Sequence, residues 1–204
     1  MLIGVDFDNT IVCCDQLFHQ AALEKKLIPS NVSITKGKVR DYLRECGKED
    51  AWTELQGYVY GVLIKKAPPF PGVFECLKHL KQRGIEVTII SHKTRYPFLG
   101  EAHDLHQAAL DWLKHHDFFN PKGAGLSHSN VYLEITKQDK LKRISQIGCS
   151  HFIDDLPEFL MEPTFPADVE RILFDPNQHH FENNHYRRAN SWKEIEQWLI
   201  GVKV

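Results

Sequence analysis

The sequence contains no apolar stretch that approaches the ~20 residues needed to span a membrane as a helix. It also lacks an excess of charge, because 25 lysines and arginines against 27 aspartates and glutamates give a formal net charge of -2. Proteins that bind nucleic acids or anionic membrane surfaces usually carry a concentrated positive charge, which is missing here. We therefore expect no nucleic-acid partner and no membrane association, and the sequence gives no indication of the oligomeric state.

The chain is also poor in cysteine pairs. Its five cysteines are an odd number, no CxxC pair occurs, and Cys13 and Cys14 are adjacent. This pattern argues against a disulfide framework. Asp6 and Asp8 interrupt the apolar N-terminus too early for a secretory signal peptide. We expect reduced thiols in a cytoplasmic protein.

What is present is an ordinary globular composition, with 42% hydrophobic and 25% charged residues among 204. A chain of this length suits one α/β domain or a core with a modest insertion. Short apolar runs that end at polar residues predict five main buried strands, and segments of helical periodicity separate them. The strands are expected at 1–5, 85–90, 131–135, 151–153 and 171–174. The alternation predicts an α/β fold with a doubly wound parallel sheet.

One interval, residues 13–66, interrupts this alternation and reads mostly as helix. A proline-rich segment starting at Ala67 ends it, because proline cannot continue a helix. We predict a core of residues 1–12 and 67–204 and a small helical insertion of residues 13–66. The insertion's aromatic residues are expected to form its own core or to line a lid; they include Trp52, Tyr58 and Tyr60.

Nearer the C-terminus, residues 175–188 are expected to shape the rim of the sheet or to form a surface loop. A terminal helix follows over residues 192–200, with Ser191 as its N-cap.

Chemically reactive side chains follow the predicted strands. In a parallel sheet, functional groups collect at the carboxyl ends of the strands. Those ends carry carboxylates, a hydroxyl and an ammonium group, namely Asp6, Asp8, Ser91, Lys137, Asp154 and Asp155. This is the set that a phosphoryl-transfer site needs, because a carboxylate can attack a phosphate dianion only where cations neutralise the charge. Magnesium prefers the hard oxygen ligands that such carboxylates supply.

The order of these residues resembles the four motifs of the haloacid dehalogenase (HAD) superfamily. Asp6-Phe7-Asp8-Asn9-Thr10 matches the DxDxT signature, and the strand that ends at Ser91 looks like the second motif. Lys137, which follows Thr136 and opens a helix, resembles the third motif. The strand that ends at Asp154-Asp155 resembles the fourth motif. The resemblance covers residues 1–175, nearly the whole chain. It implies a HAD-like core in which 13–66 is a helical, C1-type cap that closes over the site and selects the substrate.

The resemblance also implies roles for single residues. Asp6 would be the nucleophile that forms an aspartyl-phosphate, and Asp8 would be the general acid and base. Ser91 and Lys137 would hold the phosphate oxygens, with Lys140 open as an alternative to Lys137. Thr10 and His92 are expected near the substrate. Magnesium would be held by Asp6, Asp8, Asp154 and Asp155, with Glu158 as an alternative to Asp155.

The expected function is therefore magnesium-dependent hydrolysis of a phosphate monoester of a small metabolite. Superfamily dehalogenases lack an acid/base aspartate two residues after the nucleophile, so Asp8 favours a phosphatase. A phosphotransferase or phosphomutase would use the same residues and differ only in the acceptor. A non-enzymatic phosphate-binding or interaction module is a third hypothesis. A signalling receiver domain is disfavoured, because its acidic pair lies on the first strand and its phosphoryl acceptor on a middle one.

Overall fold

The structure is a computed structural model that describes residues 1–201, and it divides into two compact units. The sheet unit comprises Met1–Ile11, Pro69–Lys93 and, among the described residues, 116–201. The helical unit comprises Val12–Pro68 and Thr94–His115. Among the described residues, none of the helices is both long and apolar enough to cross a lipid bilayer.

The sheet unit is built on six parallel strands in the order β3-β2-β1-β4-β5-β6. Five of them match the predicted strands and confirm the α/β class: β1 (Leu2–Val5), β2 (Glu86–His92), β3 (Val131–Glu134), β4 (His151–Asp154) and β5 (Glu170–Phe174). The sixth, β6 (Arg187–Ala189), lies where a loop was expected. Its three residues contain no apolar run, so periodicity alone could not reveal a strand.

Strand β1 lies at the centre of the sheet, between β2 and β4. Ile3 is in register with Val87 on one side and with His151 on the other. At Gly4 a β-carbon would lie 2.5 Å from the ring of Phe152, so this position accepts no larger side chain without repacking. The tight packing fixes β1, and therefore the residues that follow it, against β4.

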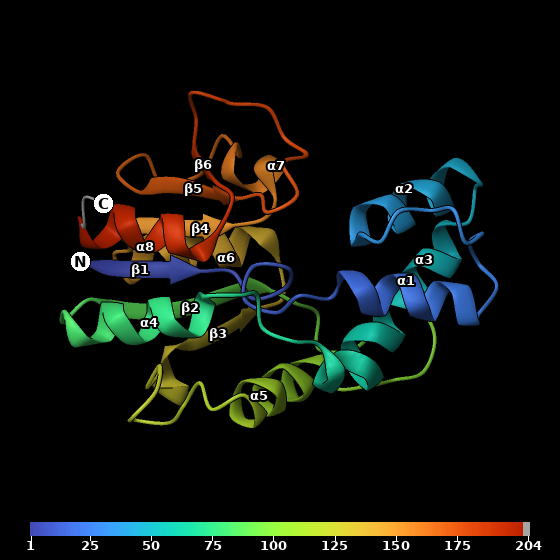
Figure 1. Ribbon diagram of the computed structural model, residues 1–204, viewed down its shortest axis with the longest axis horizontal. Helices are drawn as coiled ribbons and strands as arrows, with labels where there is room; N and C mark the ends of the chain where they lie inside the picture. Colours follow the sequence, from blue (N-terminus) through green and yellow to red (C-terminus); the bar gives the residue numbers. More distant parts are fainter. Residues whose placement is uncertain (202–204) are drawn as a thin grey trace. The chain divides into compact units, whose positions relative to one another are not determined.

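Helices cover both faces of the sheet (Figure 1). On one face α4 (Val73–Gln82) packs on α8 (Trp192–Ile200), and Trp192 contacts Phe174 of β5. On the other face α6 (Lys137–Gln146) and α7 (Pro157–Leu160) share one apolar cluster with Leu173 of β5. Because Leu173 and Phe174 are consecutive, their side chains point to opposite faces, as the pleat of a strand requires. The sheet is thus doubly wound, as predicted.

The last helix begins as expected. Ser191 is the N-cap of α8 and its hydroxyl accepts a hydrogen bond from the backbone N–H of Glu194. The Glu194 carboxylate in turn accepts the N–H of Asn190. The first bond satisfies a backbone donor that the first turn of the helix leaves free, and the second fixes the residue that precedes the N-cap.

The helical unit contains α1 (Asp15–Glu24), α2 (Lys36–Glu45), α3 (Glu49–Tyr58) and α5 (Leu105–His115). A π-helical turn (Val59–Leu63) and a 3-10 turn (Ile64–Lys66) continue α3. Phe18 contacts the rings of Trp52 and Tyr60 at centroid distances of 5.1 and 5.3 Å. Trp52 and Tyr60 therefore belong to the unit's own core, one of the two expected roles.

The helical unit is larger than residues 13–66, because it also includes residues 94–115, which the sequence assigned to the core. Trp112 of α5 is fully buried, and its indole N–H donates to the carbonyl oxygen of Ala67 at 2.8 Å. At Gly57 and Gly61 a β-carbon would lie 2.7 Å from Pro97 and 2.6 Å from His103. Such close packing joins two segments far apart in the sequence, which no local pattern could predict.

Candidate active site

Asp6 directly follows β1 and anchors the site. Its backbone N–H donates to the carbonyl oxygen of Ile153 at 2.8 Å, so the sheet ladder holds it in place. Its side chain is 7% exposed. The hydroxyl of Ser91, at the end of β2, donates to Asp6 Oδ1 at 3.0 Å. Two neighbouring strands thus deliver a carboxylate and a hydroxyl to one point at their carboxyl ends.

Lys140 is the cation of this site. Its Nζ lies 2.7 Å from Asp6 Oδ1 and 2.6 Å from Asp154 Oδ2, and its side chain is 3% exposed. Burial alone lowers the pKa of Lys140, but the carboxylates of Asp154 and Asp6 outweigh it and the net shift is upward. The ammonium group is therefore charged at neutral pH.

Lys137, which the family spacing favoured, occupies a different place. It is the first residue of α6, half-buried, and none of the hydrogen bonds or ion pairs found among the described residues joins it to Asp6. Thr136 caps the helix by accepting the N–H of Asp139, and Lys140 lies one turn further along. Residues three apart share a helix face, so the sequence could not decide between the two lysines, and the structure places Lys140 at the site.

Asp6, Asp154 and Asp155 form an acidic group whose oxygen atoms lie within 4.8 Å of one another. Asp154 is fully buried, and its burial raises the pKa of its carboxyl to about 6, with Lys140 opposing and Asp6 adding to the shift. Hard oxygen donors converging at this spacing fit a divalent cation such as magnesium. Glu158 is exposed on α7 and is not a member of the group.

Asp8 is not a member of the acidic group and pairs instead with a second buried lysine. Lys93 Nζ lies 2.6 Å from Asp8 Oδ2, and the two side chains are 3% and 14% exposed. Asp8 Oδ1 is also buried and has no hydrogen-bond partner among the described residues. Asp8 was expected among the metal ligands, yet its observed partner is a lysine. From the sequence, Lys93 could either bind a second anionic group of the substrate or be a solvated loop charge. Its alternation with Ser91 along an extended segment indicates that both side chains point to one side.

Thr10 and His92, the two further expected substrate contacts, differ in accessibility. Thr10 is fully buried, and its carbonyl oxygen accepts the indole N–H of Trp192 at 3.0 Å. Its hydroxyl oxygen finds no partner among the described residues. His92 is exposed, and its Nε2 donates to the carbonyl oxygen of Ile135 at 3.0 Å. The pKa of His92 is lowered, mainly because the ring is partly desolvated.

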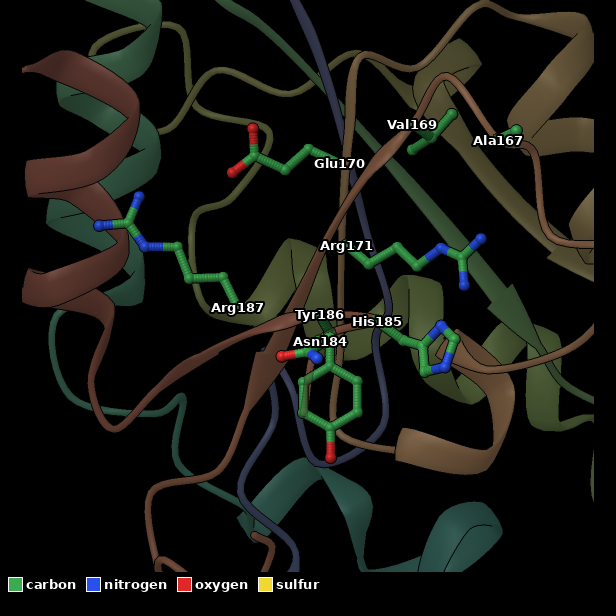
Figure 2. Close-up of a pocket in the computed structure, with 8 residues that line it drawn as sticks. All are labelled: Ala167, Val169, Glu170, Arg171, Asn184, His185, Tyr186 and Arg187. Carbon is green, nitrogen blue, oxygen red and sulfur yellow. The ribbon is translucent and has the colours of Figure 1, made fainter. Parts of the chain in front are cut away.

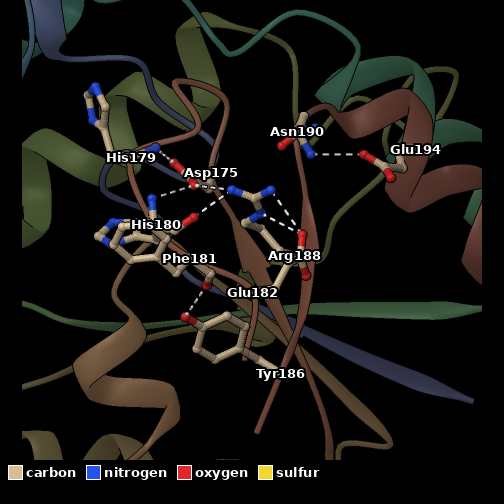
Figure 3. Close-up of polar contacts among 9 residues, drawn as sticks. All are labelled: Asp175, His179, His180, Phe181, Glu182, Tyr186, Arg188, Asn190 and Glu194. Carbon is tan, nitrogen blue, oxygen red and sulfur yellow. Dashed lines mark hydrogen bonds and ion pairs between the residues drawn. The ribbon is translucent and has the colours of Figure 1, made fainter. Parts of the chain in front are cut away.

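A separate polar network organises the segment after β5 (Figure 3). Asp175 is buried, and its carboxylate accepts the backbone N–H groups of His179 and His180, each at 2.9 Å. Arg188 of β6 lies 3.6 Å from the same carboxylate and donates to the carbonyl oxygen of His180. The network ties this segment to β6, and it contains none of the expected site residues.

A hollow of about 360 Å³ lies at the other edge of the sheet, where β5 and β6 begin (Figure 2). It is lined by Ala167, Val169, Glu170, Arg171, Asn184, His185, Tyr186 and Arg187. Its arginines are engaged with neighbours, because Arg171 donates to Leu160 and Arg187 lies 3.5 Å from the ring centroid of Trp198. None of the residues proposed for catalysis lines this hollow, since they follow the carboxyl ends of β1, β2 and β4.

Comparison with known proteins identifies the fold. No protein-family model and no curated protein matches the sequence. A HAD-superfamily hydrolase from Ehrlichia chaffeensis is 13% identical, with 98% of this chain and 96% of that chain covered at a TM-score of 0.57. A HAD-hydrolase of Bacillus subtilis bound to magnesium is also 13% identical, with 98% of each chain covered at 0.57.

A third solved structure is a HAD family hydrolase from Deinococcus radiodurans with bound phosphate and sodium. It is 13% identical, and 98% of this chain and 95% of that chain are covered at a TM-score of 0.58. Likeness at this level of identity establishes the fold. The chain therefore has the fold of HAD-superfamily hydrolases, and the resemblance seen in the four motifs is confirmed at that level.

Proposed function

We propose that this protein hydrolyses a phosphate monoester of a small metabolite with magnesium, through a phosphorylated Asp6. The observation that carries the proposal is the bridge made by Lys140, which contacts Asp6 and Asp154 at 2.7 and 2.6 Å while Ser91 donates to Asp6. The carboxylate can attack phosphorus, and the cation and the hydroxyl beside it can stabilise the phosphate oxygens.

In the first step an oxygen of Asp6 attacks phosphorus, and the bond to the leaving alkoxide breaks. Asp8 gives its proton to that alkoxide and later takes one from the water that cleaves the aspartyl-phosphate. Lys140 and Ser91 contact the non-bridging oxygens, where transition-state charge accumulates. Magnesium, held by Asp6, Asp154 and Asp155, would neutralise charge on the phosphate and lower the repulsion that Asp6 meets.

Two features of the chain support this choice over dehalogenation. Asp8 is present two residues after the nucleophile, where a proton donor for an alkoxide is required. The acidic group also supplies donors for a divalent cation. The magnesium and phosphate in the Bacillus subtilis and Deinococcus radiodurans structures are consistent with the same chemistry in proteins of this fold. Transfer to a second metabolite would use the same residues and differ only in the acceptor.

The test is a screen of sugar phosphates, nucleotides and phosphorylated amino acids with magnesium, measuring release of inorganic phosphate. The unchanged protein is expected to be active, and Asp6→Asn to lose essentially all activity. Chelation by EDTA should abolish the activity, and added magnesium should restore it. Activity that survives both Asp6→Asn and EDTA contradicts the mechanism. Release of halide from haloacids, without phosphate release, would identify a dehalogenase instead.

A further inference from the structure

The site contains two buried lysines, and the proposed mechanism uses only one of them. Lys140 contacts Asp6 and Asp154, whereas Lys93 contacts Asp8 at 2.6 Å. Lys93 is 4% exposed, which is unusual for a side chain that normally keeps its ammonium group in water. A buried charge of this kind is retained only where a partner of opposite sign compensates it.

The position of Lys93 is well defined by its surroundings. Its backbone N–H donates to the carbonyl oxygen of Glu134 at 2.8 Å, which extends the β2–β3 ladder by one residue beyond His92. Its ammonium group lies 5.9 Å from the ring centroid of Phe7, the residue between the two motif aspartates. The strand end therefore holds the main chain of Lys93, and Asp8 holds the ammonium group.

The two oxygens of Asp8 have different environments. Oδ2 is bound by Lys93, whereas Oδ1 is buried without a hydrogen-bond partner among the described residues. A buried oxygen without a partner is costly in a folded protein unless a ligand or water completes it. A proton-transfer residue needs this arrangement, because one oxygen must be fixed and the other must remain open to the substrate or to water.

We propose that Lys93 is a positioning residue, which binds Oδ2 of Asp8 and thereby directs Oδ1 at the leaving-group oxygen and, later, at the attacking water. The inference rests on the proposed phosphatase function and adds a residue to it. It differs from the view that Lys93 binds a second anionic group of the substrate, because a lysine whose charge is already engaged by Asp8 is not an open anion site.

The test compares Lys93→Met, Lys93→Arg, Asp8→Asn and the double variant Lys93→Met/Asp8→Asn. The assay uses p-nitrophenyl phosphate, or the best substrate of the screen, with magnesium. Lys93→Met is expected to lower kcat about 100-fold, the lower end of what a proton-transfer residue contributes, with KM within about threefold. Lys93→Arg should have a kcat at least about tenfold higher than Lys93→Met, because arginine keeps the positive charge. Lys142→Met is the control, since Lys142 is 70% exposed and pairs with Asp139 on the surface of α6.

The double variant separates action through Asp8 from an independent role. If Lys93 acts only through Asp8, the double variant is no slower than Asp8→Asn alone. Thermal unfolding of every variant identifies loss of fold. If Lys93→Met does not fold, the double variant provides a folded comparison, because it removes both charges of the pair together. Inhibition by inorganic phosphate should be unchanged in Lys93→Met.

Three outcomes overturn the inference. In the first, the double variant loses as much activity as the two single variants combined. In the second, Lys93→Met weakens inhibition by phosphate by the same factor as it lowers kcat. Either result would show that Lys93 binds the substrate directly. Full activity of Lys93→Met beside an inactive Asp6→Asn contradicts this inference alone. An active Asp6→Asn, or a parent inactive on every phosphate ester, contradicts the proposed function on which the inference rests.

Discussion

Two buried lysines pair with the carboxylates of the candidate site. Asp6 and Asp154 share the ammonium group of Lys140, and Asp8 has that of Lys93. A buried carboxylate that loses its cation loses several kcal/mol of stabilisation, about 3–5 in typical cases, because it cannot recover its hydration. We therefore expect each lysine to contribute to stability, so experiments on the proposed chemistry must measure both stability and activity.

Replacement of single lysines on α6 tests the assignment of the phosphate-binding cation. Lys140→Met is expected to lower kcat by about 100- to 1,000-fold, as removal of one donor to transition-state oxygens typically does. Lys137→Met should reduce activity by less than about tenfold, because none of the ion pairs found among the described residues joins it to Asp6. Steady-state kinetics of both variants distinguishes the two lysines, and thermal unfolding checks that each variant is folded. Equal losses in both variants, or a larger loss in Lys137→Met, would return the role to Lys137.

At the scale of elements, the segment between β5 and β6 depends on one buried carboxylate. Asp175→Ala would leave the amides of His179 and His180 without their acceptor, and it would remove one of the anionic partners of Arg188. We expect a loss of about 2–3 kcal/mol in the free energy of unfolding, since each of these part-buried hydrogen bonds to a charged group contributes about 1.5–3 kcal/mol at most. Urea unfolding measures it. Asp168→Ala, at an exposed aspartate, should change stability by no more than about 0.5 kcal/mol.

Hydrogen exchange gives an independent check on this segment. The amides of His179 and His180 should exchange faster in Asp175→Ala, while amides of β1 remain protected. Unchanged exchange at both histidines would show that the carboxylate does not order the segment.

Close packing inside the helical unit leads to another prediction. Gly61→Ala would place a β-carbon 2.6 Å from that of His103, so we expect a loss of about 1–3 kcal/mol. Gly37→Ala is the matched control, because a β-carbon there meets no atom within 4 Å. Alanine should stabilise α2 by about 0.5–1 kcal/mol relative to glycine. Chemical denaturation compares the two variants, and equal stability would contradict the packing.

Sequence reasoning succeeded where local periodicity and strand topology carry the information. Five strands were located from apolar runs, and parallel topology brought Asp6, Ser91 and Asp154 to one edge. It could not separate Lys137 from Lys140, because a helix presents both on similar faces and the depth of each depends on tertiary packing.

Other features depended on contacts between distant segments or on weak local signals. Residues 94–115 join the helical unit through Trp112 and the two tightly packed glycines, which is long-range information. β6 has too few apolar residues to show the alternation of apolar and polar side chains that indicates a strand. Lys93 could have been found, because alternation places it on the same side as Ser91, but a lysine after a strand is usually solvated.

At the scale of the whole molecule, a bound cation should raise thermal stability. Magnesium at about 100 times its dissociation constant stabilises a folded protein by about 2.7 kcal/mol, which for a chain of this size raises Tm by about 5–10 °C. Differential scanning fluorimetry with and without magnesium measures the increase. Asp155→Asn should reduce it, whereas Glu158→Gln should retain it, since Glu158 lies outside the acidic group. The reverse result would move the third ligand to Glu158.

The composition of the helical unit has a practical consequence for protein engineering. The chain leaves and re-enters the sheet unit twice, so each half of the helical unit is covalently anchored at both ends. A chimaera that transplants residues 13–66 alone would replace Gly57 and Gly61 and present new side chains to Pro97 and His103. Donor sequences should therefore be exchanged as a matched pair of segments, and libraries that randomise one should diversify the other with it.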